Sequence, residues 1–270
     1  MATLFLVGLG PGAKAQMTYQ AAEAIERAEV IVGYGRYLSF IESYLVGKTI
    51  IESGMTREWQ RARQAIEAAV SQDVALVCSG DSGVYAMAPL VFELLSQNPS
   101  IQIEVTVVPG VTAAVSCASL VGAPLGHDHC SISLSDLLTP WPVICQRIEA
   151  VASSDFVVAF YNPRSRKRQH QIEQARDILL KYRSPDTPVA IVDQAYRAGQ
   201  QVMLATLADF CERPFAMAAT VIVGNSNSYR FGDYIITPRG YQQKYSLSDG
   251  ALRPGQRRGR TLVVDDDSID

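Results

Sequence analysis

Three glycine-rich segments are the strongest sign of ligand chemistry in this sequence, because each follows directly on an apolar run. They are residues Gly8–Ala13, Ser79–Tyr85 and Pro109–Ala114. Glycine allows a tight bend, and it lets a ligand lie close to the main chain. The carboxyl ends of parallel strands meet at one edge of a sheet, where open α/β sheets bind ligands. We therefore expect the three bends to lie around one ligand, with bare main chain facing it.

The first bend formally matches the dinucleotide-binding pattern G-x-G-x-x-A. Pro11, however, has no backbone N–H to offer to a pyrophosphate, and the helical pattern begins only near Thr18. The second strand runs into Gly33–Gly35 instead of the Asp or Glu that binds a ribose. The missing carboxylate also disfavours the common Rossmann-type methyltransferase site. A nicotinamide dehydrogenase is therefore a weak alternative.

A second polar cluster, His127-Asp128-His129, contains two of the three histidines of the chain. These residue types suit general acid/base catalysis, and Asp136 is a further candidate. Surface histidines and a helix-capping role for Asp136 are the structural alternatives. We expect no metal site, because no further ligand cluster accompanies His127, His129 and Cys130.

The elements that must position these residues alternate between strand and helix in the N-terminal part of the chain. The predicted strands are Thr3–Val7, Val30–Val32, Val74–Cys78 and Ile103–Val108, and the predicted helices are Thr18–Ala28, a segment from Thr56 to Val70, and Pro89–Ser96. This alternation predicts a mostly parallel sheet with helices on both faces.

The regular alternation of strand and helix stops after a helix of small residues predicted at Val111–Leu120. Six further strands are predicted, at Ile132–Leu134, Phe156–Phe160, Val189–Val192, Gln201–Ala205, Thr220–Val223 and Tyr234–Thr237, with helices at Pro142–Ala152 and Lys167–Tyr182. Several of these strands have no helix between them, which favours antiparallel pairing and a mixed sheet. We predict an α/β fold of two domains, residues 1–112 and 113–241, with a cleft between them. The polar segment 242–270 is predicted to be a disordered tail.

Composition excludes several classes of protein. The 270 residues carry 24 Lys and Arg against 27 Asp and Glu, a net charge of −3, which gives no global attraction to nucleic acid or to an anionic membrane. No apolar run is long enough to span a bilayer. The five cysteines are scattered without a C-x-x-C pair, which favours reduced thiols and a cytoplasmic protein.

Taken together, the glycine-rich segments resemble the tetrapyrrole methyltransferases, an S-adenosylmethionine-dependent family that acts on cobalamin and sirohaem intermediates. The matching segments are Val7–Gly12, Ser79–Asp81, Pro109–Ala114 and Thr220–Asn225, in the order of the family. Two further segments, Gly126–Trp141 and Phe160–Ser165, look like those of the members that methylate precorrin-3B at C17.

This resemblance implies S-adenosylmethionine-dependent methylation of precorrin-3B or cobalt-precorrin-3 at C17, with ring contraction, by a homodimer that holds the cofactor in its interdomain cleft. Carried over motif by motif, it implies cofactor contacts at Pro11, Gly80, Asp81, Val84, Thr112, Ala113, Tyr161, Asn162, Ala195 and Gly224. The family often has Met at the position of Asn162 and Gly at that of Ala195. The alternatives are a sister enzyme acting at another macrocycle carbon and a non-catalytic tetrapyrrole-binding protein.

A tetrapyrrole substrate would carry several carboxylates, which directs attention to arginines. Arg164 and Arg166 crowd the start of the helix predicted at Lys167–Tyr182, where the helix dipole disfavours cations. We interpret them, together with Arg36, as candidates for substrate binding, with Arg197 as a further one. A solvated basic turn is the structural alternative. The proton movements that ring contraction requires would fall to His127, Asp128, His129 or Asp136.

Overall fold

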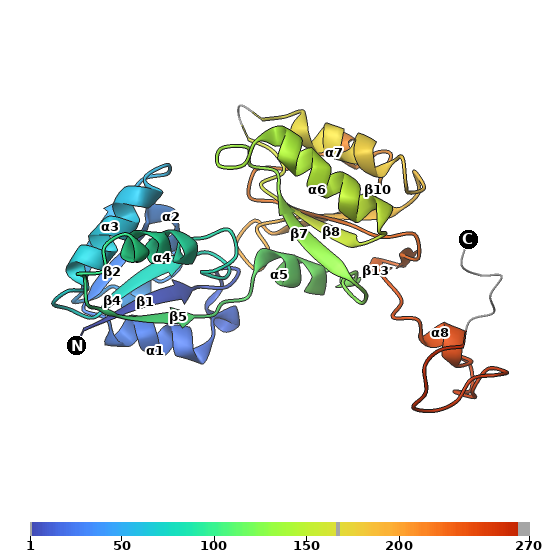
Figure 1. The fold of residues 1–270 in the computed structure, drawn as a ribbon, viewed down its shortest axis with the longest axis horizontal. Coiled ribbons are helices and arrows are strands. Elements are labelled where there is room, and N and C mark those ends of the chain that lie inside the picture. The colour runs from blue at the N-terminus through green and yellow to red at the C-terminus, as the bar shows by residue number, and fades with distance from the viewer. Residues whose placement is uncertain (1, 166–167, 264–270) are drawn as a thin grey trace.

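The computed structural model describes residues 2–165 and 168–263 and consists of two α/β halves (Figure 1). The N-terminal half has a five-stranded parallel sheet in the order β3-β2-β4-β1-β5. Its strands are β1 (Thr3–Gly8), β2 (Val30–Tyr34), β3 (Thr49–Ser53), β4 (Val74–Cys78) and β5 (Glu104–Val108). Its helices are α1 (Tyr19–Arg27), α2 (Gly35–Leu38), α3 (Glu58–Ala68) and α4 (Ala88–Ser96), with short 3-10 turns at Lys14–Gln16 and Glu42–Tyr44.

Both faces of this first sheet are covered, as the unbroken apolar runs of β1 and β4 predicted. Leu4 and Leu6 of β1 pack with α3 and α4, whereas Phe5 and Val7 pack with α1 on the other face. Every residue of β4 is buried. The edge strand β3 is half exposed and polar at its ends, and the sequence analysis did not anticipate it.

The C-terminal half has a mixed sheet in the order β10-β9-β11-β8-β7, in which only β7 and β8 are parallel. Its strands are β7 (His129–Ser133), β8 (Val157–Tyr161), β9 (Pro188–Asp193), β10 (Gln201–Thr206) and β11 (Thr220–Val223). Helices α6 (Trp141–Ser153) and α7 (Gln171–Leu179) cover one face together with a 3-10 turn at Phe210–Glu212, and α5 (Ala113–Ser119) covers the other. The predicted fold class, a parallel sheet followed by a mixed one, is confirmed.

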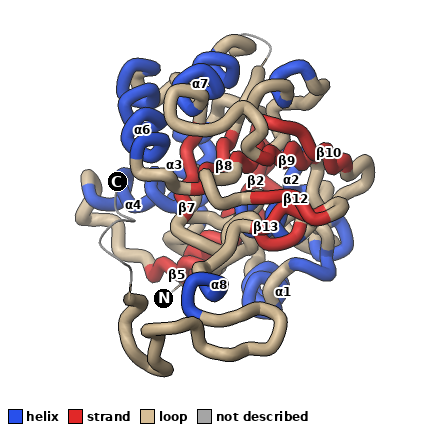
Figure 2. The backbone as a smooth tube through the Cα atoms, turned by 90° about the vertical axis from the view of Figure 1, so that its right-hand side faces the viewer, coloured by secondary structure: helices blue, strands red, loops and turns tan. Residues whose placement is uncertain are grey.

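A small third sheet joins β12 (Tyr229–Phe231), β13 (Tyr234–Ile236) and β6 (Gly122–Ala123). The chain passes from one half to the other over residues 109–112, just before α5 packs against the second sheet (Figure 1). Figure 2 shows α6 and α7 on one side of the strands β8, β9 and β10, with α8 and its surrounding loops on the opposite side. None of the helices in the described residues is long and apolar enough to cross a membrane.

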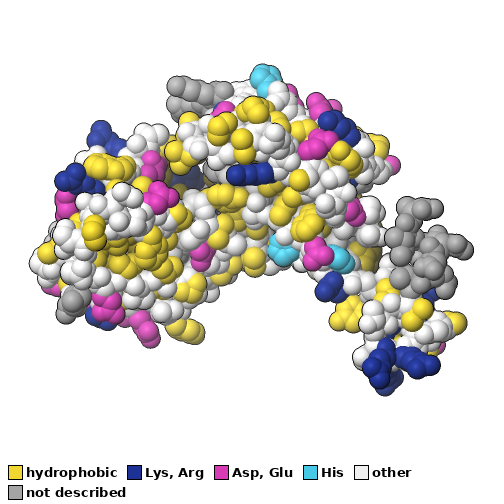
Figure 3. Space-filling view, viewed as in Figure 1, with side chains coloured by type: hydrophobic (Ala, Val, Ile, Leu, Met, Phe, Trp, Pro, Cys, Tyr) yellow, Lys and Arg dark blue, Asp and Glu magenta, His cyan; other side chains and the backbone are white. Residues whose placement is uncertain are grey.

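The segment predicted to be disordered from residue 242 has local order over its described part. Helix α8 (Tyr241–Lys244) is followed by an antiparallel bridge between Tyr245 and Leu252, and Gln256 exchanges two hydrogen bonds with Val263. This segment stands away from the two sheets (Figure 1), and exposed basic side chains gather on it (Figure 3). Residues 264–270 lie outside the described part of the chain.

Main chain packs directly on main chain where β1, β4 and β5 end. A Cβ atom on Gly110 would lie 2.1 Å from the Gly80 carbonyl oxygen, and one on Gly8 would lie 2.7 Å from both that oxygen and the Gly110 nitrogen. Backbone cannot yield as a flexible side chain can, so these positions require glycine.

We therefore expect Gly110→Ala to lower the free energy of unfolding by about 3 kcal/mol, because its methyl group must displace backbone. Gly54→Ala is the matched control, since a Cβ there meets nothing within 4 Å, and we expect a change within about 0.5 kcal/mol. Urea unfolding of both variants measures the difference. Equal stabilities would contradict the close packing of the bends.

Candidate functional site

The carboxyl ends of the first sheet face one end of the second sheet, and side-chain contacts cross between the halves there. Tyr161, the last residue of β8, forms a hydrogen bond of 2.7 Å between its hydroxyl and Thr112 Oγ1, and the hydroxyl accepts another from the Ala114 N–H. The Tyr85 hydroxyl, from the loop after β4, donates to the Ser131 carbonyl at 2.8 Å. The rings of Tyr85 and Tyr161 lie 5.1 Å apart. These contacts fix the start of α5 against the second sheet.

The three glycine-rich bends are bonded to one another. Gly10 and Gly80 exchange two backbone hydrogen bonds, of 2.9 and 2.7 Å. The Asp81 carboxylate accepts hydrogen bonds from the N–H groups of Gly83, at 2.8 Å, and Gly110, at 3.1 Å. The predicted cofactor residue Asp81 therefore also ties the second bend to the third.

Free space at the bends is confined to fewer glycines than the sequence analysis expected. Gly8 and Gly110 face each other's backbone, and the space over Gly12 is filled by Arg197 and Phe40. At Gly80, whose φ is +66°, the nearest atoms to an added Cβ belong to the backbone of residues 111–113, starting at 3.7 Å. Gly80 thus has room for a methyl-sized group, in ordinary van der Waals contact with Thr112 and Ala113.

On the second sheet, two predicted cofactor residues lie at the same end. Asn162 follows Tyr161 with a left-handed φ of 51°, and its side-chain amide donates to Ser133 Oγ at 3.1 Å. Ala195 is buried in the turn after β9, between Gln194 (φ 51°) and Tyr196 (φ 59°). Such φ values are strained for residues other than glycine, and they concentrate at functional sites.

Asp193 immediately precedes this turn, and sequence reasoning missed it. Its side chain is 9% exposed, and its Oδ1 is buried without a hydrogen-bond partner among the described residues. An unpaired buried carboxylate oxygen costs free energy unless a donor reaches it. A polar residue that ends an otherwise apolar strand was the one sequence signal that could have identified it.

Gly224 does not belong to this cluster, which corrects the sequence expectation. Strand β11 is antiparallel to both neighbours, so Thr220 pairs with Val192 at the cleft end, whereas Gly224 follows the opposite end. There its N–H donates to Pro188 and its carbonyl accepts from the buried Arg183. Thr220 is the β11 residue that the fold brings to the cleft. Val84 lies in the loop beside Tyr85 and is 36% exposed.

The histidine cluster also lies away from the cleft. His129 opens β7 and pairs with Val157, while Ser133 at the other end pairs with Tyr161, about 13 Å along the strand. Because β7 and β8 are parallel, the residues at the start of β7 and the residues that follow β8 lie at opposite ends of the sheet. His127 and the exposed Asp128 contact each other there.

Asp136 is the one acid/base candidate that the structure places at the cleft end. It accepts a hydrogen bond from the Gln171 amide at 3.2 Å and lies 3.5 Å from the Arg168 guanidinium. Arg168 in turn donates to the carbonyls of Leu134 and Asn162, so Asp136 is linked to the end of β8.

Arg164, predicted at a helix start, lies well before the helix, because α7 begins at Gln171. Arg164 donates to the carbonyls of Cys211 and Arg213 and lies over the Phe215 ring at 4.0 Å, so its guanidinium is engaged within its own half. Arg166 lies outside the described residues. The helix-dipole argument for Arg164 was therefore wrong.

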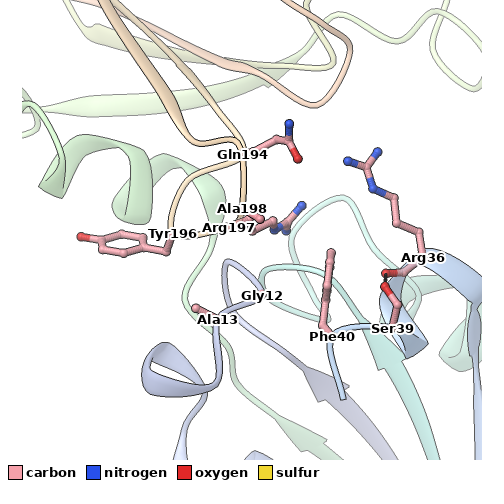
Figure 4. A pocket seen from close by; sticks show the side chains of 9 residues that line it. All are labelled: Gly12, Ala13, Arg36, Ser39, Phe40, Gln194, Tyr196, Arg197 and Ala198. Carbon is pink, nitrogen blue, oxygen red and sulfur yellow. Dashed lines mark hydrogen bonds between the residues drawn. The ribbon is translucent and has the colours of Figure 1, made fainter. Parts of the chain in front are cut away.

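A cavity of about 450 Å³ opens between the halves beside the first bend (Figure 4). Arg36 and Phe40 line it from the first half, and Gln194 and Arg197 line it from the second. Arg197 donates hydrogen bonds to the Pro11 carbonyl and to Ser79 Oγ and stacks over the Phe40 ring. It therefore connects the turn after β9 to the first two bends.

No thiol at this site is poised for attack. Burial raises the pKa of Cys78, at the end of β4, and of Cys117, on α5, to about 11. Both thiols therefore stay protonated near neutral pH and are poor nucleophiles. The arrangement instead suits binding and alignment of two reactants.

Comparison with known proteins gives consistent matches. The family described as Tetrapyrrole (Corrin/Porphyrin) Methylases matches residues 3–211. A Priestia megaterium protein named cobalt-factor III methyltransferase is 49% identical over 260 residues, covering 94% of this chain and 48% of that protein. A Salmonella typhimurium protein named probable cobalt-factor III C(17)-methyltransferase is 48% identical, covering 88% of this chain and 99% of that protein. The crystal structure of the methyltransferase CobJ superposes with a TM-score of 0.83 at 36% identity, over 88% of this chain and all of that one. The chain thus spans about half the length of the Priestia relative and almost all of the other two.

The different positions of the acid/base candidates lead to a testable contrast. We expect Asp136→Asn to lower the turnover of the tetrapyrrole reaction by about a hundredfold, because proton transfer by a positioned carboxylate contributes at least that much. His129→Ala should leave turnover within about twofold, because His129 is exposed at the far end of β7. Steady-state kinetics of both variants measure this, and the reverse order of effects would contradict the placement.

Proposed function

The chain belongs to the tetrapyrrole (corrin/porphyrin) methylase family, and we propose that it methylates C17 of a precorrin-3-level macrocycle, with ring contraction, in cobalamin biosynthesis. The observation that carries this proposal is the Salmonella relative, which aligns over almost its whole length at 48% identity and is named a probable cobalt-factor III C(17)-methyltransferase. Because this chain aligns with only 48% of the Priestia relative, the proposal concerns only the part that the two proteins share.

Between the metal-free and the cobalt-containing substrate, the names of relatives favour cobalt. The relatives at 48 and 49% identity are both named for cobalt-factor III. We accordingly propose cobalt-factor III as the substrate and treat metal-free precorrin-3B as the alternative.

The proposed methyl donor is S-adenosylmethionine, which supplies a methyl group bound to a positively charged sulfur. The residues at the cleft suit such a group. Gly80 leaves room for a methyl-sized group beside Thr112 and Ala113, and Asp193 Oδ1, which has no partner among the described residues, can accept from a cationic or hydroxyl donor. Tyr161 and Ala195 approach the same place from the second sheet. We propose these residues, with Pro11, Asp81, Val84 and Asn162, as the donor site.

Transfer of a methyl group to a ring carbon is an in-line displacement, so the main task of the protein is alignment. Holding two reactants in line contributes about 7–11 kcal/mol to the lowering of a barrier. The bonded bends on one side and the Tyr161–Thr112 contact on the other give this chain a rigid frame for it. Asp136 is proposed to move protons during ring contraction, and we propose a homodimer as the working form.

The direct test is product analysis with a labelled methyl donor. We expect incubation with cobalt-factor III to give one labelled methyl group at C17 and a contracted ring, detected by mass spectrometry and NMR, with faster turnover than metal-free precorrin-3B. Methylation at another carbon would favour a sister enzyme. Binding of the tetrapyrrole without release of S-adenosylhomocysteine would favour a non-catalytic binding protein, and either result would contradict the proposal.

A further inference from the structure

The interdomain cavity beside the first bend contains two arginines that come from opposite halves. Arg36 lies on α2, directly after β2, and Arg197 lies in the turn after β9. Figure 4 shows both guanidinium groups directed into the space between the halves, with Gln194 beside them.

Within the described part of the chain, no carboxylate forms an ion pair with either guanidinium. Arg36 is exposed, and within residues 2–165 and 168–263 its side chain has no hydrogen bond or ion pair. The partners of Arg197 are a carbonyl, a hydroxyl and an aromatic ring, all of them uncharged. Two acidic side chains lie in the neighbourhood of the arginines. Glu52 lies against Gly35, the residue before Arg36, and Asp193 ends the strand that precedes the turn of Arg197. Neither forms an ion pair with either arginine in the described part of the chain.

Arg197 is also held in a way that leaves part of its guanidinium available. Its Nε and Nη2 donate to Pro11 and Ser79, whereas Nη1 has no partner among the described residues. Burial is the largest cause of the lowered pKa of Arg197, and the neighbouring Arg36 cation lowers it further. Two cations that share a cavity repel each other, and an anion between them removes this cost. A guanidinium whose orientation is already fixed loses little freedom when it binds.

We propose that Arg36 and Arg197 form a carboxylate-binding subsite, which holds an acidic side chain of the substrate across the cleft. This inference rests on the proposed function, because that function supplies a macrocycle with several carboxylates. One carboxylate has two oxygens, so each arginine can donate to it from its own side. A substrate bound in this way links the two halves and orients the macrocycle relative to the donor site at Gly80. The amino-acid carboxylate of the methyl donor has the same chemistry, and the test separates the two sources.

The test compares equilibrium binding of two probes, cobalt-factor III by absorbance titration and S-adenosylhomocysteine by calorimetry. We expect Arg36→Gln to weaken cobalt-factor III binding at least about tenfold, because a hydrogen bond to a charged group is lost. Binding of S-adenosylhomocysteine should stay within about twofold. The salt dependence of cobalt-factor III binding should also become shallower, because one ionic contact is gone.

Arg63→Gln is the matched control, because Arg63 is exposed on α3, where it pairs with Glu67 and lies over the Trp59 ring of the same helix. It changes the net charge equally and should leave both affinities unchanged. Arg197→Lys keeps the charge but loses the planar fork, so it should weaken cobalt-factor III binding as well. In the double variant Arg36→Gln/Arg197→Lys, the fold-loss of cobalt-factor III affinity should be smaller than the product of the two single fold-losses, because both arginines hold the same carboxylate.

Unchanged cobalt-factor III affinity in Arg36→Gln would overturn the proposal. Weakened S-adenosylhomocysteine binding with unchanged cobalt-factor III binding would also overturn it, since the carboxylate would then be that of the donor. Thermal unfolding of each variant separates a lost contact from a lost fold, and Arg36→Gln removes no side-chain contact in the described residues. Both titrations measure binding without turnover, so a failure of the proposed C17 methylation would be detected independently in the wild-type product.

Discussion

Backbone packing at the ends of β1, β4 and β5 is the constraint on which the site depends. Gly8, Gly80 and Gly110 meet main chain to main chain, and the Asp81 carboxylate ties two of the bends together. Because glycines follow or end these strands, this edge of the first half consists mainly of packed main chain and carries few side chains. The side chains that complete the site therefore reach in from the second half, where Tyr161 and Arg197 form hydrogen bonds with the first.

The direction of the strands decides which residues of the second half can take part. In the parallel first sheet, every strand ends at the cleft, so the bends that follow the strands converge. In the mixed second sheet, β8 and β9 end at the cleft but β11 begins there. Thr220 thus lies near the site while Gly224 supports the far end of the sheet by accepting a hydrogen bond from Arg183. Asp136 follows the cleft end of β7, whereas His127 and His129 lie at its opposite end.

Much of this architecture could be predicted from the sequence, because local patterns determine it. The apolar runs of β1 and β4 and the helical repeat of α6 mark elements within a residue or two of their observed limits. The polar edge strand β3 gave no such signal. The glycine bends and Asp81 were also predictable, since turn chemistry is local. Gly224, His129 and Asp193 were not, because their places depend on strand direction and on contacts between residues far apart in the sequence.

The central proposal is that a methyl donor lies against Gly80, beside Thr112 and Ala113. Calorimetric titration of S-adenosylhomocysteine into Gly80→Ala tests it most directly, with Gly47→Ala as the control. Both glycines have positive φ, but the control faces open space, so the two variants carry similar backbone strain. The account predicts that Gly80→Ala weakens binding at least about tenfold, since its methyl group would take the place proposed for the donor, while Gly47→Ala binds like the wild type. Equal, unweakened affinity in both variants would contradict it.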